Sequence, residues 1–255
     1  MREECGLAGV SLSEGRTAQT AASLLYYALY GLQHRGQESA GISVQNDTLL
    51  TKKGMGLVSE ALPYEQISAL KSNVGIGHVR YSTTGTSDFI NSQPLEVGYH
   101  EGKLTIAHNG NLVNTWRLRR ELERGGAVFL TGTDSEIIAQ LLAKGLRYRT
   151  PLEAIKKLMG ILVGSYSLVI LLNGVVYAVR DPMGIKPLCF GEVEGGFMVA
   201  SESVALDAVG GTLRDDVQPG EVVVLSEGQF ERHMLCRDAP KAHCVFEYIY
   251  FARAD

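Results

Sequence analysis

Cysteine is scarce in this sequence. The 255 residues contain four cysteines, which lie far apart in the chain: Cys5, Cys189, Cys236 and Cys244. A chain of this length buries enough apolar surface to fold without covalent cross-links, unlike small secreted domains. The spacing therefore argues against a disulfide framework, and each cysteine needs an explanation of its own.

Long apolar runs and an excess of positive charge are also missing. No run approaches the roughly 20 apolar residues that span a bilayer. The 24 lysines and arginines are outnumbered by 28 aspartates and glutamates, which gives a formal net charge of -4. Such a surface attracts neither phosphate backbones nor anionic lipids, so we expect no nucleic acid or membrane partner. Residues 1–4 are too short and too acidic for a signal peptide, and we expect a cytoplasmic protein.

Helical signals are present in three places. Apolar residues recur at helical spacing over residues 21–32, which predicts a helix with one buried face. Thr133 is followed three residues later by Glu136, and Thr150 by Glu153, each before an apolar run. This spacing is typical of a capping box, so we expect two further helices that begin after these threonines.

Extended segments make up most of the remaining pattern. Residues 165–172 and 175–179 are joined by Asn-Gly, the strongest short signal for a β-hairpin. Other short β-rich runs occupy residues 41–45, 48–52, 75–78, 103–107, 197–200 and 221–225. Many hairpins among a few helices favour an α+β fold with antiparallel sheets in one large domain.

Cys5 stands directly before an apolar segment that reads as a strand. If the peptide before Cys5 were removed, the new α-amine would lie beside the thiol. Its pKa near neutrality would let this amine activate the sulfur as a base. A single cysteine is more often a small buried apolar residue, and its position alone favours that structural role.

Cys5 begins the first of seven motifs, whose order is known from one enzyme family. They read CGLAGV at 5–10, LQHRGQESAG at 32–41, HVRYSTTG at 78–85, AHNGNL at 107–112, TGTDSE at 131–136, RDPMGIKPL at 180–188 and ASES at 200–203. This set resembles the class II, or N-terminal nucleophile, glutamine amidotransferases. The second motif and the ending FEYIYFAR at 246–253 resemble the glutaminase half of the amidophosphoribosyltransferase family in particular. The resemblance covers essentially the whole chain.

The resemblance implies a fold and a set of roles. The fold would be the four-layer αββα sandwich of N-terminal nucleophile hydrolases, with Cys5 at the end of a central strand attacking the side-chain amide of glutamine. The Asn109 side chain and the Gly110 backbone N–H would form an oxyanion hole. Arg80 would bind the carboxylate of glutamine and Asp134 its ammonium group. Four further candidates for substrate contact, for which structural pairing is an equal alternative, are Arg35, His78, Tyr81 and Thr83.

The resemblance also implies how the chain is divided. Residues 1–4 end in two acidic residues, like the short propeptide of some family members. Residues 5–240 would then be the amidotransferase domain, and 241–255 a tail leading toward a phosphoribosyltransferase domain that is absent here. We expect this domain or subunit as the partner that accepts the ammonia for phosphoribosylamine formation in purine synthesis, and homo-oligomers are compatible with the sequence. A glutaminase serving another acceptor, and a catalytically silent glutamine-binding or scaffold relative, remain as alternatives.

Two segments invite other interpretations. The loop at 180–188 has the charges of a phosphate site, but no Gly-x-x-x-x-Gly-Lys accompanies it, which favours a rigid turn. His233, Cys236, His243 and Cys244 do not have the spacing of a zinc site. In some amidophosphoribosyltransferases a cysteine at the position of Cys244 ligates an iron–sulfur cluster, whose other ligands would fall outside this sequence. We therefore predict neither a metal nor another cofactor.

Overall fold

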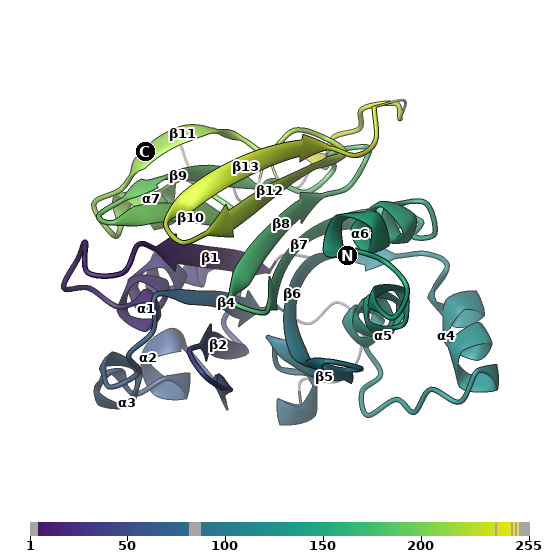
Figure 1. Cartoon of the computed structure of the whole chain (residues 1–255), viewed down its shortest axis with the longest axis horizontal. Helices are drawn as coiled ribbons and strands as arrows, with labels where there is room; N and C mark the ends of the chain where they lie inside the picture. The colour runs from purple at the N-terminus through teal and green to yellow at the C-terminus, as the bar shows by residue number, and fades with distance from the viewer. Residues whose placement is uncertain (1–4, 82–87, 238, 246, 248, 250–255) are drawn as a thin grey trace.

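Two antiparallel sheets lie face to face in the computed structural model, which describes residues 5–81, 88–237, 239–245, 247 and 249 (Figure 1). The first sheet has the strand order β11 (Thr212–Asp216), β9 (Cys189–Val193), β10 (Gly196–Ala200), β1 (Gly6–Leu12), β4 (Val74–Arg80), β2 (Ser39–Gln45) and β3 (Leu49–Met55). The second has the order β13 (Gln229–Met234), β12 (Glu221–Ser226), β8 (Val175–Arg180), β7 (Gly164–Leu172), β6 (Gly102–Leu112) and β5 (Leu95–Tyr99).

Helices cover the outer face of each sheet, as Figure 1 shows. The first sheet carries α1 (Ala21–Gly31), α2 (Val58–Ala61), α3 (Tyr64–Ser68) and α7 (Val204–Asp207). The second sheet carries α4 (Thr115–Arg124), α5 (Asp134–Leu146) and α6 (Pro151–Met159). Two short 3₁₀ turns complete the set, η1 (Gln33–Arg35) and η2 (Phe89–Asn91). Within the described part of the chain, no helix is long and apolar enough to span a membrane.

Three separate apolar cores correspond to the three interfaces between four layers. One lies between the first sheet and its helices, one between the second sheet and its helices, and one between the two sheets. Successive side chains of β1 point to opposite faces of the sheet, so this strand contributes to two of the cores. Leu7 faces the other sheet, whereas Ala8 and Val10 pack toward α1. The expected four-layer sandwich with two antiparallel sheets is confirmed.

Most of the expected elements form where the local signals place them. The helix predicted over residues 21–32 is α1, and the hairpin predicted around Asn173-Gly174 is β7–β8. Asn173 and Gly174 have φ values of 50° and 76°, as a type I′ turn requires. At α6 the capping box is complete, since Thr150 accepts from the backbone of Glu153 and Glu153 accepts from that of Thr150.

The start of α5 differs from the expectation in one respect. The helix begins at Asp134, but the side chain of Thr133 makes no capping hydrogen bond. Its hydroxyl pairs instead with the Thr131 hydroxyl at 2.8 Å. Glu136 accepts from the backbone N–H groups of Leu130 and Thr131 at 2.9 and 2.6 Å. The predicted capping box is therefore wrong here, because both of its side chains are used to order the loop before the helix.

Candidate active site

Cys5 lies at the start of β1, a central strand of the seven-stranded sheet, and it is 6% exposed. Its backbone N–H donates to Asn109 Oδ1 at 3.3 Å, and its carbonyl accepts from Arg35 Nε at 2.9 Å. Its thiol lies 3.6 Å from the Tyr81 carbonyl as a weak donor. Contacts from three other segments thus fix the backbone and the sulfur of this residue.

Asn109 belongs to β6 and reaches Cys5 from the opposite sheet. Because a backbone N–H is a donor, the amide oxygen of Asn109 faces Cys5 and its nitrogen points elsewhere. This Nδ2 is buried and has no hydrogen-bond partner among the described residues. An unpaired buried donor costs free energy, so a substrate oxygen at this place would be stabilised strongly.

Gly110 follows with a φ of +147°, a conformation that residues with a Cβ rarely adopt. A Cβ built at this position would collide with the Ser165 carbonyl of the neighbouring strand. The backbone therefore requires glycine here. This explains the Asn-Gly pair of the AHNGNL motif better than an ordinary turn does, because the pair lies within a strand.

Arg80 and Tyr81 lie at the end of β4, beside Cys5. Gly6 pairs with Val79 in antiparallel register, which brings the beginning of β1 next to the end of β4. Arg80 is 3% exposed, and its Nη1 is 3.9 Å from Glu38 Oε2. The structure thus places the predicted carboxylate-binding arginine at the same end of the sheet as the thiol. Thr83, also a predicted contact, lies outside the described residues.

Asp134 is the first residue of α5, and it is buried. Its Oδ2 accepts from the Leu112 backbone at 3.0 Å, and its Oδ1 lies 3.7 Å from His108 Nδ1. Ser135 Oγ lies 3.0 Å from the same nitrogen of His108. The sequence analysis missed Ser135, although it is part of the TGTDSE motif that contains Asp134.

His78 and His108 form a buried pair between β4 and β6. The ring Nε2 of His78 lies 3.2 Å from the His108 carbonyl, which makes it the donor. Burial lowers the pKa of His78 to about 3 and also lowers the pKa of His108, where nearby Asp134 partly offsets the effect. Both rings are therefore neutral at pH 7. For His78 these contacts favour structural pairing between the sheets over direct substrate contact.

Arg35 is also held by groups of the chain itself. Its guanidinium pairs with the carboxylates of Glu202 and Glu247, and its side chain is fully buried. Lys186 lies 3.3 Å from the same Glu247. These contacts favour the structural-pairing alternative for Arg35 and leave it next to the Cys5 carbonyl. Neither glutamate had a role in the sequence analysis, because a pairing over this distance in sequence leaves no local signal.

The loop at 180–188 is the rigid turn that the sequence favours. The Asp181 carboxylate accepts from the backbone of Met183, Gly184 and Ile185. Arg180 donates to the carbonyls of Gly184, Lys186 and Val217. Both charged side chains are thus occupied by the backbone of the loop and its neighbour, which leaves them poorly placed for a phosphate.

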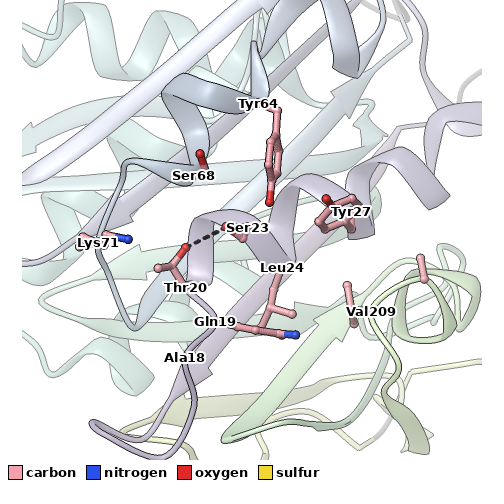
Figure 2. A pocket seen from close by; sticks show the side chains of 11 residues that line it. Ala18, Gln19, Thr20, Ser23, Leu24, Tyr27, Tyr64, Ser68, Lys71 and Val209 are labelled. Carbon is pink, nitrogen blue, oxygen red and sulfur yellow. Dashed lines mark hydrogen bonds between the residues drawn. The ribbon is translucent and has the colours of Figure 1, made fainter.

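The described residues contain a separate cavity but no cluster of metal ligands. Among the residues that are described, no group of three His, Cys, Asp or Glu side chains is placed to hold a metal ion. A cavity of about 540 Å³ lies beside α1, where Figure 2 shows Thr20, Ser23, Tyr27, Tyr64 and Lys71 around it. None of the predicted site residues lines this cavity.

Comparison with known families agrees with this geometry. Residues 78–208, just over half of the chain, match a family model described as a glutamine amidotransferase domain. The chain belongs to this family. The matched range includes Arg80, Asn109, Gly110 and Asp134, whereas Cys5 precedes it.

Individual relatives of this amidotransferase domain share one name. The domain is 49% identical to an amidophosphoribosyltransferase of Methanothermobacter thermautotrophicus, over 100% of the chain and 54% of the relative. It is 46% identical to one of Archaeoglobus fulgidus, over 98% of the chain and 54% of the relative. The domain thus spans about half the length of the curated relatives it matches.

Two solved structures share the fold over almost the whole domain. One is described as glutamine phosphoribosylpyrophosphate amidotransferase from B. subtilis complexed with ADP and GMP, with a TM-score of 0.88 and 35% identity. The other is described as the allosteric regulatory enzyme of purine biosynthesis, with a TM-score of 0.90 and 37% identity. Each match covers 98% of this chain and 53% of the solved chain.

Proposed function

We propose that this domain hydrolyses the side-chain amide of glutamine through a glutamyl thioester on Cys5. The contact between the Cys5 backbone nitrogen and Asn109 Oδ1 carries the proposal. It brings the Asn109 side chain next to Cys5, and the buried Nδ2, which has no partner among the described residues, would donate to the oxyanion of a tetrahedral intermediate. A buried structural cysteine would not need such a donor beside it.

The chemistry follows from these groups. Removal of residues 1–4 would free the α-amine of Cys5, which takes the thiol proton while the sulfur attacks the amide carbon. Asn109 Nδ2 and the Gly110 N–H stabilise the oxyanion. The α-ammonium returns its proton to the leaving nitrogen, ammonia departs, and a thioester remains. Water then attacks the thioester, which yields glutamate and restores the thiol.

Substrate recognition needs two charged partners for the free amino acid. Arg80 suits the carboxylate because its planar guanidinium offers parallel donors, and it lies at the end of the strand next to Cys5. Asp134 suits the ammonium group because it is a buried carboxylate at the start of α5. Tyr81 and Thr83 would complete the substrate contacts, with Arg35 and His78 supporting the site from behind.

The ammonia acceptor is proposed from the relatives. Since proteins named amidophosphoribosyltransferase match the whole domain over about half their own length, we assign the ammonia to a phosphoribosyltransferase domain or subunit. The reaction would then serve phosphoribosylamine formation in purine synthesis, in the cytoplasm and without a cofactor. In this proposal residues 1–4 are a propeptide, 5–240 the amidotransferase domain and 241–255 the lead toward the acceptor domain.

An Asn109→Ala variant tests the oxyanion assignment. Loss of one such donor lowers kcat by about 10²–10³-fold in other enzymes, and we expect a similar fall in glutamate release from glutamine. Asn46→Ala is the matched control, because Asn46 is exposed in the β2–β3 turn. Circular dichroism verifies that both variants are folded. An Asn109→Ala variant with the wild-type rate would contradict the assignment. Glutamine binding without turnover by the processed wild-type chain would favour the silent glutamine-binding alternative.

A further inference from the structure

Glu247 lies far from Cys5 in sequence, yet one side chain separates the two in space. Arg35 Nε donates to the Cys5 carbonyl at 2.9 Å, and Arg35 Nη2 donates to Glu247 Oε1 and Oε2 at 3.0 and 3.1 Å. The Arg35 side chain is fully buried, and that of Glu247 is only 10% exposed. The guanidinium is therefore held at one end by the carboxylate and oriented toward Cys5 at the other.

Glu247 is one of the two carboxylates with which Arg35 pairs among the described residues. Lys186 is 3% exposed and lies 3.3 Å from Glu247, so this carboxylate serves two buried cations. Glu202 also pairs with Arg35, and its other oxygen lies 2.9 Å from His34 Nε2. Removal of the Glu247 charge takes an ion pair away from both Arg35 and Lys186. Groups buried in this way interact strongly, so Arg35 would be expected to shift toward Glu202.

Such a shift would be transmitted to the thiol. Cys5 is fixed on one side by Asn109, at its nitrogen, and on the other by Arg35, at its carbonyl. Loss of the Arg35 contact would release the carbonyl and allow the residue to shift relative to the Asn109 and Tyr81 contacts that remain. Displacements of about 1 Å at a reacting group can cost about 10²-fold in rate, even when their cause lies far from the chemistry.

Glu247 is itself placed by the segment after the last strand. This segment returns to the domain where the Ala242 N–H donates to the Met183 carbonyl at 2.9 Å. Val245 and Ile249, on either side of Glu247, are 58% and 67% exposed. The Glu247 carboxylate is therefore largely buried, whereas these two described neighbours are exposed.

We propose that Glu247 is a positioning residue for Cys5, acting through Arg35, so that the contact between Glu247 and Arg35 controls the rate of glutamine hydrolysis. This proposal rests on the proposed function for its kinetic consequence. The contacts from Glu247 to Arg35 and from Arg35 to Cys5 can also be tested by a measurement that does not depend on turnover.

The kinetic test compares Glu247→Gln with Glu231→Gln in the full chain. Glu231 is the matched control, because it is an exposed carboxylate on β13 that pairs with His233. We expect Glu247→Gln to lower kcat for glutamine hydrolysis by about tenfold with little change in KM, since alignment and not substrate affinity is affected. Glu231→Gln should match the wild type. Glu247→Asp keeps the charge and should fold as the wild type does, with an intermediate kcat because the shorter side chain does not reach both cations.

A double-mutant cycle shows whether the effect passes through Arg35. Arg35→Lys removes the forked contact with Cys5 and Glu247. If Glu247 acts through Arg35, the Arg35→Lys/Glu247→Gln pair should be no slower than Arg35→Lys alone. Independent, multiplying effects would overturn the proposal, as would a wild-type kcat in Glu247→Gln.

The readout that does not require turnover is the carbonyl resonance of Cys5. Labelling with [1-¹³C]cysteine gives one signal for each cysteine, and Cys5→Ala identifies that of Cys5. We expect Glu247→Gln to move this signal toward its position in Arg35→Lys, while Glu231→Gln leaves it in place. An unmoved signal would overturn the proposal. A moved signal in a chain that releases no glutamate would support the contact and refute the proposed function instead.

Discussion

The oxygen and the nitrogen of the Asn109 side chain have different environments. Its oxygen fixes the backbone of Cys5, and its nitrogen remains buried without a partner among the described residues. Leaving a buried donor unpaired costs about 1–3 kcal/mol, which proteins accept mainly where a ligand will complete the bond. Gly110 adds a strand position where a Cβ cannot fit. In the proposed function, the unpaired donor lowers stability but leaves a place for the oxyanion to bind.

Replacement of His78 by glutamine should change the pH dependence of stability. Burial lowers the pKa of His78 from its ordinary 6.5 to about 3, so between these values the unfolded chain binds a proton that the folded chain does not. The contribution is complete above pH 6.5 and is lost as the pH falls, by about 1.4 kcal/mol per pH unit at most.

Urea unfolding at pH 7 and pH 5 measures this effect. The free energy of unfolding of the wild type should fall by about 2 kcal/mol more than that of His78→Gln over this interval. Comparing the change with pH, rather than the absolute stabilities, removes the cost of the lost packing. Parallel pH dependences in the two proteins would show that His78 is not held neutral by burial.

The elements meet at one end of the sandwich, and this meeting creates the site. The beginning of β1, the end of β4 and the Asn109 position of β6 converge there, each contributing a polar group. The start of α5 contributes Asp134 through its contact with the Leu112 backbone at the end of β6.

The capping box of α6 provides a test at one helix end. Thr150→Ala removes a side-chain acceptor for the backbone of Glu153 and should lower the free energy of unfolding by about 1 kcal/mol. Thr150→Ser keeps the acceptor and should cost much less. Urea unfolding of the three proteins measures both changes. Equal stability of Thr150→Ala and the wild type would indicate that the cap contributes nothing in this context.

The molecule as a whole joins residues that no local pattern connects. The hairpin at Asn173 and the helix over residues 21–32 could be predicted from spacing alone, because turn chemistry and helical periodicity act over a few residues. The Cys5–Asn109 contact spans 104 residues and the Arg35–Glu247 pair spans 212. The first was expected only through resemblance to a family, and the second was missed. The start of α5 was predicted correctly but its cap was not, since Thr131 competes for the Thr133 hydroxyl.

The central claim is that Cys5 becomes an N-terminal nucleophile. Its most direct test is the intact mass of the purified full chain before and after treatment with the glutamine analogue diazo-oxo-norleucine, with Cys5→Ala as control. We expect loss of residues 1–4 and a single adduct that is absent from the control. An unprocessed and unlabelled chain, or an adduct that persists in Cys5→Ala, would contradict it.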